Sequence, residues 1–192
     1  MIAIDVRADI DRAIRSLTEL QRTVIPTATA RALNKTAAQA KTQAAREIRD
    51  RYNISSRIVG RQISVFRATR TGQTSLTAIV RPFGRKFPVM AFQARQTPAG
   101  VRIQIIRGSP KVIAHAFIAR TRSGHVGVFA RGVYSGRSFV HQKPRLPITE
   151  LFTVGVPQAF WHRVVIEALQ RKVREKFPTI LEHEIRFAIT KP

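Results

Sequence analysis

The sequence contains no cysteine in its 192 residues. It therefore has no disulfide framework, no thiolate ligand for zinc and no cysteine nucleophile. Residues 1–5 lack the basic start and the apolar run of a secretory signal. No stretch approaches the roughly 18 uncharged apolar residues that are needed to span a membrane. We expect a soluble protein that is made in a cytoplasm and has no membrane partner.

Carboxylates are also scarce, and the middle of the chain has none. The whole sequence has 11 Asp and Glu against 34 Lys and Arg, which gives a formal net charge of +23. Residues 51–149 contain 15 Arg and 3 Lys but no Asp or Glu, so this segment carries +18. An ordinary solvated surface mixes both signs, and so large a field of one sign favours a polyanion or a strongly acidic protein as partner.

Sequence patterns for catalysis and metal binding are missing as well. None of the five histidines pairs with another at the i, i+4 spacing of a zinc-binding helix. Residues 132–138 resemble a phosphate-binding loop only faintly, because the Gly-Lys-Ser/Thr ending is absent. We interpret the one tight cluster of histidine and carboxylates, at residues 182–184, as a solvated helix face. We therefore expect no enzyme, no metal site and no cofactor.

The N-terminal part has helical patterning. Apolar residues spaced about one turn apart predict a helix over residues 5–22, which should end before Pro26 because proline disfavours helical backbone in the residue before it. A second helix, over residues 26–50, contains eight alanines. An alanine face buries little area and stabilises a fold only where another backbone approaches closely. A short third helix should follow Ser55 or Ser56. The alanines that we expect to pack against neighbours, other subunits included, are Ala28, Ala32, Ala37, Ala40 and Ala44.

The middle of the chain changes to strand patterning. Residues 64–70 and 75–81 are rich in β-branched and aromatic residues and predict a hairpin. Residues 100–107 alternate apolar and polar side chains, which predicts a strand with one buried face. Residues 116–120 and 125–131 flank a Ser-Gly turn and predict a second hairpin. Strands joined by such short turns pair in the antiparallel direction.

The order of these elements predicts a single α+β domain over residues 1–192, with a central antiparallel sheet. Its parts are N-terminal helices (5–63), a basic strand-rich part (64–131), a basic loop with prolines (132–156) and C-terminal helices (157–190). In the last part a helix should begin near Pro157 and break at Pro178, and Thr179 should cap a final helix.

The basic segment lacks the signatures of the common nucleic-acid-binding modules. It has no zinc-finger spacing, no aromatic RNA-recognition strand and no heptads after a basic region. Sequence-specific reading of bases is therefore unsupported, whereas salt-sensitive attraction to phosphates fits the composition. An acidic protein surface fits it equally well. The side chains that we expect to face DNA or an acidic partner are Arg120, Arg122, Arg131, Arg137, Lys143 and Arg145.

Residues 143–160 read Lys-Pro-Arg-Leu-Pro-Ile-Thr-Glu-Leu-Phe-Thr-Val-Gly-Val-Pro-Gln-Ala-Phe. This stretch resembles a motif of the prophage minor tail protein Z family, in which Arg-Leu-Pro-Ile, two residues, Leu-Phe and Gly-Pro-Ser-Val-Pro follow one another. The chain departs from it at residues 153–155, where Thr-Val-Gly replaces Gly-Pro-Ser. The residues of this motif and its flanks are Pro144, Leu146, Pro147, Ile148, Leu151, Phe152, Pro157 and Phe160.

Three further stretches resemble the same family. Residues 24–34 resemble its proline-initiated, alanine-rich helix, which ends in an Ala-x-Asn step. Residues 114–118 and 125–132 resemble two of its strands. Together with the motif, these stretches cover residues 24–190 in the family's order.

The resemblance implies a structural protein of the virion of a long-tailed phage. Proteins of this family complete the tail at its head-proximal end, or neck, and help to join it to the head. They are similar to other neck proteins that form rings, usually hexamers. The implied partners are further copies of the chain, the tail tube or tail terminator, the head–tail connector proteins, and genomic DNA in the lumen.

Within that interpretation, residues 132–147 would be a docking segment, and the protein would assemble in the host cytoplasm. The residues alone leave open a different function. A free basic protein that binds nucleic acid through its phosphates, without sequence specificity, would have the same composition.

Overall fold

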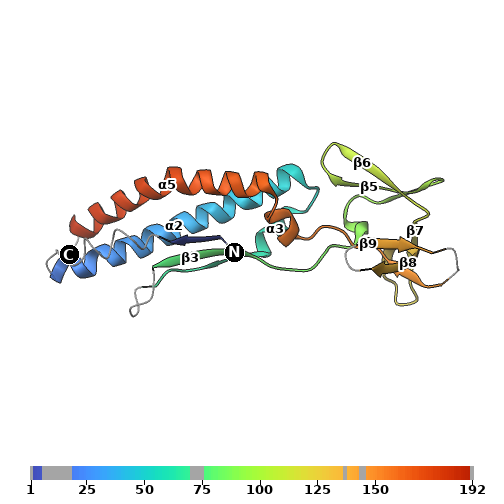
Figure 1. Ribbon diagram of the computed structural model, residues 1–192, viewed down its shortest axis with the longest axis horizontal. Coiled ribbons are helices and arrows are strands. Elements are labelled where there is room, and N and C mark those ends of the chain that lie inside the picture. Colours follow the sequence, from blue (N-terminus) through green and yellow to red (C-terminus); the bar gives the residue numbers. More distant parts are fainter. Residues whose placement is uncertain (1, 6–18, 70–75, 136–137, 143–145, 191–192) are drawn as a thin grey trace.

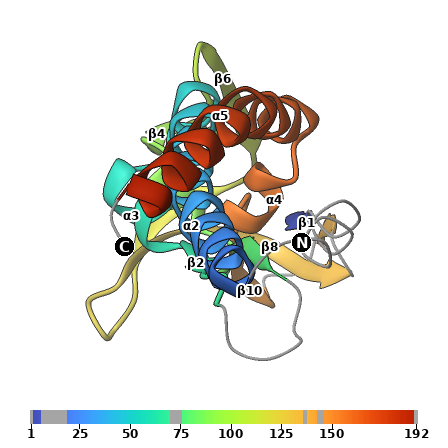
Figure 2. The same cartoon turned by 90° about the vertical axis from the view of Figure 1, so that its left-hand side faces the viewer.

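Two long helices form one end of the molecule. The computed structural model describes residues 2–5, 19–69, 76–135, 138–142 and 146–190. Helices α2 (Glu19–Arg51) and α5 (Arg163–Thr190) lie side by side and run in opposite directions (Figures 1 and 2). At ~1.5 Å per residue they are about 50 and 42 Å long. Most of the strands gather at the other end, so the molecule is elongated (Figure 1).

Helix α2 is the central element of the helical end. On one side it contacts α5, and on the other it packs on a sheet of β1 (Ile2–Asp5), β3 (Thr77–Pro82) and β2 (Ile63–Phe66). This sheet is antiparallel, with β3 between β1 and β2. Pairing of β2 with β3 confirms the hairpin predicted from the sequence, although residues 70–75 at its turn lie outside the described residues.

The alanines of α2 allow this double coverage. Ala28, Ala32, Ala37, Ala40 and Ala44 are at most 2% exposed. Ala37, Ala40 and Ala44 belong to one apolar core together with larger side chains such as Leu33 and Ile48, while Ala28 and Ala32 are buried on another side of the helix. Small side chains let the backbones of neighbouring elements approach closely, as the sequence predicted, and here those neighbours are elements of the same chain.

Both prolines that were expected to interrupt helices lie inside them. Helix α2 is continuous through Pro26, and α5 is continuous through Pro178, so the predicted breaks and the cap at Thr179 are wrong. A proline removes one backbone hydrogen bond and crowds the preceding turn, which costs roughly 3 kcal/mol. Packing of α2 and α5 along their lengths offsets that local cost. The predicted helix over 5–22 is also wrong at its start, where β1 lies, and residues 6–18 fall outside the described part.

Polar contacts supplement the packing of α2. The Asn34 amide donates to the Ala68 carbonyl at 3.0 Å and accepts from the Ala68 N–H at 2.8 Å, which ties the helix to the segment after β2. Lys35 forms an ion pair with Glu184 of α5, whose side chain is 4% exposed. The sequence placed Glu184 on a solvated face, and this interpretation is wrong. Its carboxylate lies between the two helices because Lys35 provides the opposite charge.

The short third helix is confirmed. Helix α3 (Ser56–Arg61) follows Ser55 as its N-cap residue and buries Val59. A second short helix, α4 (Val156–Phe160), begins with a proline at its first turn, as predicted for Pro157. It leads into α5 after a turn at residues 161–162.

The strand-rich end contains two further antiparallel sheets. In the first, β5 (Gly100–Ile106) lies between β4 (Arg95–Thr97) and β6 (Ser109–Ala114). In the second, β8 (Val126–Ser135) lies between β7 (Phe117–Arg120) and β10 (Ile148–Glu150), and it also pairs with β9 (Ser138–His141). The predicted strand over 100–107 and hairpin over 116–131 are confirmed, whereas β4, β6, β9 and β10 were not predicted.

The region predicted as a loop, 132–156, is therefore largely structured. Strand β8 extends to Ser135, and β9 folds back on it. Gly132 permits this return: its φ is +144°, and a Cβ there would lie 2.1 Å from the Val140 carbonyl. In the sequence this glycine suggested a loop, but it marks the close approach of two paired strands.

The two ends of the molecule have two apolar cores, and Ile105 of β5 packs against both of them. The first core joins α2, α3, α4, α5 and the β1–β3–β2 sheet. The second lies among β5, β7, β8, β10 and the 3-10 turn η1 (Val89–Ala91). Each core therefore supports one end, and the chain segments that cross between them set how the ends are arranged.

Close packing of α2 predicts that two adjacent alanines differ strongly in how well they tolerate a larger side chain. Ala37→Leu adds three carbon atoms to a fully buried position and should lower the free energy of unfolding by about 1–3 kcal/mol. The matched control Ala38→Leu, at an exposed position of the same helix, should change it by less than about 0.5 kcal/mol. Thermal or urea unfolding of both variants measures the difference. Equal effects would show that the helix is not tightly covered at Ala37.

The ion pair between the long helices predicts that removing one of its charges destabilises the fold more than removing both. Lys35→Met leaves the buried Glu184 carboxylate without its cation and should destabilise the fold by roughly 1–3 kcal/mol. Lys35→Met combined with Glu184→Met removes both charges and should recover most of that loss, because apolar replacements of buried pairs are often neutral. Chemical unfolding of the two variants measures the recovery. A double variant less stable than the single one would contradict it.

Candidate nucleic-acid interface

The basic residues of the acid-free segment form an exposed and unbalanced surface. Every described Lys and Arg in residues 51–149 is exposed except Arg51, which is half-buried. Within the described part of the chain, none of them forms an ion pair. The two long helices differ, because Arg46, Arg163 and Arg186 each pair with a carboxylate four residues away. Charge compensation therefore differs between the long helices and the acid-free segment.

The first carboxylate after the basic segment does not neutralise an arginine. Glu150 in β10 is 20% exposed and lies 2.9 Å from Nε2 of His125, across the edge of the β7–β8–β10 sheet. It also lies over Gly127, where a Cβ would meet its Oε1 at 2.8 Å. This carboxylate therefore contacts a histidine and forms no ion pair with any described arginine.

The arginines predicted to face a partner do not converge on one site. Arg120 ends β7 and Arg122 lies in the turn after it, while Arg131 lies further along β8, opposite Ile148 of β10. All three are exposed. The other predicted residues, Arg137, Lys143 and Arg145, lie outside the described residues. The described members thus belong to a distributed surface.

Arg131 borders a hollow with two histidines. The hollow has a volume of about 700 Å³ and is lined by His115, Phe117, Arg131, His141 and Gln142. The rings of His115 and His141 lie 6.2 Å apart, and Phe139 stacks edge-on against His141 at 5.1 Å. Ring nitrogens, a guanidinium and an amide offer several hydrogen-bond donors beside an aromatic surface. The proximity of the two histidines depends on β9, which was not predicted.

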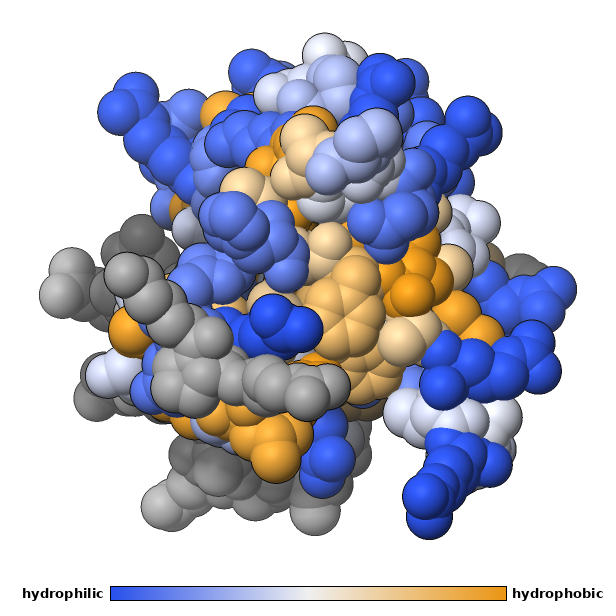
Figure 3. Space-filling view, turned by 90° about the vertical axis from the view of Figure 1, so that its right-hand side faces the viewer, coloured by the Kyte–Doolittle hydropathy of each residue, from blue (hydrophilic) through white to orange (hydrophobic). Residues whose placement is uncertain are grey.

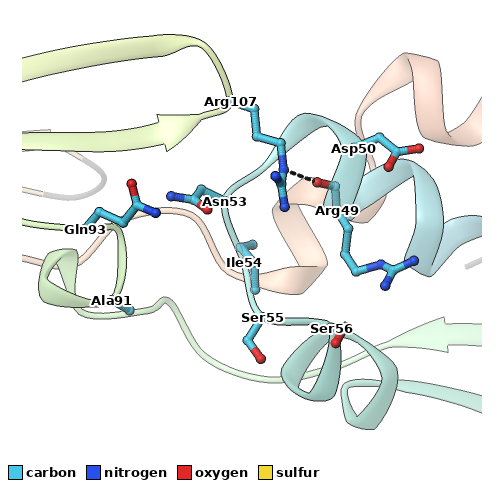
Figure 4. A pocket seen from close by; sticks show the side chains of 9 residues that line it. All are labelled: Arg49, Asp50, Asn53, Ile54, Ser55, Ser56, Ala91, Gln93 and Arg107. Carbon is cyan, nitrogen blue, oxygen red and sulfur yellow. Dashed lines mark hydrogen bonds between the residues drawn. The ribbon is translucent and has the colours of Figure 1, made fainter.

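A second hollow lies where the two ends of the molecule meet (Figure 4). Its volume is about 770 Å³, and Arg49, Asp50 and Asn53 line it from one side and Gln93 and Arg107 from the other. Arg107 Nε donates to the Arg49 carbonyl at 2.6 Å. Backbone N–H groups of Asn53 and Arg107 donate to the carbonyls of Ile105 and Arg51. These bonds attach the end of α2 to the end of β5, so the hollow belongs to the junction between the ends.

One pair of arginines was not predicted from the sequence at all. In the register of β4 with β5, Arg95 lies directly opposite Arg102, and Arg102 lies opposite Val112 of β6. Both arginines are exposed. Their juxtaposition follows from the pairing of β4, a three-residue strand with no clear pattern in the sequence.

The family-like motif acts as a connection between the two cores. Leu151 is buried in the second core, and Phe160 is fully buried in the first. Between them, the N–H of Phe152 donates to the Tyr134 hydroxyl at 2.7 Å, and the N–H of Thr153 donates to the Phe87 carbonyl at 2.9 Å. The buried part of the motif is thus structural.

The rest of the motif is exposed or outside the described residues, apart from Pro157, which is half-buried. Leu146 is 71% exposed, Ile148 47% and Phe152 41%, and Pro147 is also exposed. Pro144 lies outside the described part. The departure at 153–155 has a local reason, because a Cβ at Gly155 would lie 2.6 Å from the Arg85 carbonyl. Glycine therefore suits the close crossing of two chain segments at this point.

The five alanines that we assigned to subunit packing have little surface to offer a second subunit. Ala28, Ala32, Ala37, Ala40 and Ala44 are at most 2% exposed in the single chain, and the last three belong to the first core. Their small size serves the internal packing of α2. Any contact between subunits has to use other surfaces.

Metal and membrane sites are not indicated. In the described ranges, no three His, Cys, Asp or Glu side chains gather as a metal ion would require. None of the helices there combines the length and apolar character of a membrane crossing.

No curated protein and no solved structure matches the chain. The model of one family, described as prophage minor tail protein Z, matches residues 9–191. The match includes the long helices, the basic strands and the motif that joins the two cores. Because it covers nearly the whole sequence, the chain belongs to the prophage minor tail protein Z family.

Proposed function

We propose that the protein completes the phage tail at its head-proximal end and helps to join tail to head. Family membership indicates a structural role in the tail and a place in the virion. Within the tail, we assign the protein to a ring, hexameric to match the symmetry of the tail, that surrounds or holds the DNA end. No enzymatic step is part of this function.

The observation that carries the proposal is the division of charge along an elongated molecule. The two long helices carry charges of both signs and pair part of them, as in Arg163 with Glu167. The strand-rich end presents exposed arginines without counter-ions in the described residues. A subunit placed beside a channel that carries DNA needs this division, with one part to build the assembly and another to face a polyanion.

The strand-rich end also has apolar surface for protein neighbours. Figure 3 shows this end of the molecule with apolar side chains at its centre and polar side chains around them. The exposed apolar residues of this end include Val112, Val133, Val140 and Ile148. Contiguous apolar surface rimmed by polar groups is typical of protein interfaces. We assign such contacts to further copies of the chain and to the tail terminator, tail tube or connector proteins.

A free nucleic-acid-binding protein of the host cell is the alternative function. It would use the same arginines, but its family would not be that of a virion component. The two functions place the protein differently. Recovery at a fixed ratio to other tail proteins in purified particles supports the structural role, and association with host chromatin or ribosomes supports the alternative.

Phage particles made without this protein provide the decisive test. We expect the deletion to yield filled heads and finished tails that are separate, or joined weakly enough to part during purification. Electron microscopy counts joined and separate particles, and supply of the wild-type chain in trans should restore joining. Particles that stay normal and firmly joined without the protein would overturn the proposal.

A further inference from the structure

We propose that Arg95 and Arg102 form a clamp for a phosphate group of the DNA backbone. The two residues lie directly opposite each other in β4 and β5, on the face that leaves Arg102 exposed and turns Val101 and Ile103 into the second core. This inference rests on the proposed function, since it names the part of the basic surface that contacts DNA.

The pair is costly for the isolated chain. Side chains directly opposite each other in an antiparallel pair have Cβ atoms about 4.5–5.5 Å apart, and like charges in such positions destabilise a sheet. Among the described residues, no carboxylate forms an ion pair with either arginine. A bound anion between the two guanidinium groups would turn this repulsion into attraction.

The backbone that carries the pair is held firmly. The side chain of Gln96, next to Arg95, donates to the Gly100 carbonyl at 3.1 Å and accepts from the Ile118 N–H at 2.9 Å. Thr97 also donates to the Gly100 carbonyl, at 2.9 Å. These bonds attach the three-residue strand β4 to β5 and to β7, so the backbone at both arginines is ordered before a ligand binds. Less ordering entropy is then lost on binding.

The face around the pair is open. Val112, the next residue in the same row across the sheet, is 50% exposed. The β5–β6 hairpin projects from the strand-rich end in both ribbon views (Figures 1 and 2). A nucleic-acid strand can therefore approach the row Arg95–Arg102–Val112 without displacing another element, with phosphate oxygens at the arginines and sugar carbons against the valine.

Phosphate fits this pair better than a protein carboxylate. Arginine presents a planar fork of donors that matches the two free oxygens of a phosphodiester, and two opposed forks can share one phosphate or hold neighbouring ones. The described basic residues around the pair are all unpaired, so the field continues beyond it. A regular polyanion satisfies such a continuous field more completely than a protein surface of mixed sign.

The test measures binding of the purified full-length chain to a short duplex of random sequence at a series of KCl concentrations. In the double variant Arg95→Gln/Arg102→Gln, the slope of log affinity against log salt should fall by about two, one unit for each phosphate-binding arginine removed. The matched control Arg171→Gln/Arg174→Gln removes the same charge from exposed positions of α5 and should keep the wild-type slope.

A stability measurement on the free protein separates the clamp from ordinary structural damage. Because each substitution removes the repulsion, Arg95→Gln and Arg102→Gln should each raise the Tm, by roughly 1–3 °C, and the double variant should gain less than the sum. In the variant Arg95→Lys/Arg102→Lys the charge is kept without the fork, so the salt slope should persist while affinity falls several-fold.

Three results would overturn the clamp. The first is an equal loss of slope in the α5 control, which would show a diffuse field. The second is a fall of Tm in both single variants, which would show that the arginines stabilise the fold. The third is a wild-type chain that binds polyglutamate but not DNA, which would indicate an acidic protein as partner. None of these results affects the assignment to head–tail joining, which is tested on particles.

Discussion

The approach of α5 and a sheet to opposite sides of α2 is the constraint on which the helical end depends. Five alanines at or below 2% exposure bring these elements close, and larger neighbours such as Leu33 and Ile48 fill the remaining space. This packing explains why two prolines stay within helices. It also gives Glu184 a place between the helices that is tolerable only beside Lys35. The same burial removes the alanine face from any interface between subunits, so an assembly has to use surfaces outside it.

The strand-rich end differs from the helical end, because carboxylates of the described residues do not balance the positive charges on its surface. Its core is smaller, and its strands β4 and β10 have only three residues each. Basic side chains there lack counter-ions in the described residues, and the nearest carboxylate is engaged by His125. Self-repulsion of this kind lowers the stability of a free subunit and is relieved by a polyanion. The helical end has the larger apolar core, and the strand-rich end has the surface that we assign to a polyanionic partner.

Much of the fold was predictable from periodicity, and the failures have physical causes. The strand over 100–107 and both hairpins were found because alternation and turn residues are local signals. Strands β4, β6, β9 and β10 were missed, since their pairing depends on partners rather than on their own short sequences. Pro26 and Pro178 were misread because tertiary packing overrode local propensity. Of the candidate site, the basic character was evident, but the opposition of Arg95 and Arg102 is a matter of register, which no local pattern encodes.

The family motif has a structural role, because it connects the two cores. Leu151 anchors one end of it in the second core and Phe160 anchors the other in the first, only nine positions later. Gly155 allows this short segment to pass directly against the backbone at Arg85. A connection so short, anchored at both ends, restricts how the strand-rich end can turn relative to α2 and α5. In a ring of such subunits, that restriction would hold every basic face at the same angle to the axis. The motif thereby sets the orientation of the end that we assign to DNA relative to the two long helices.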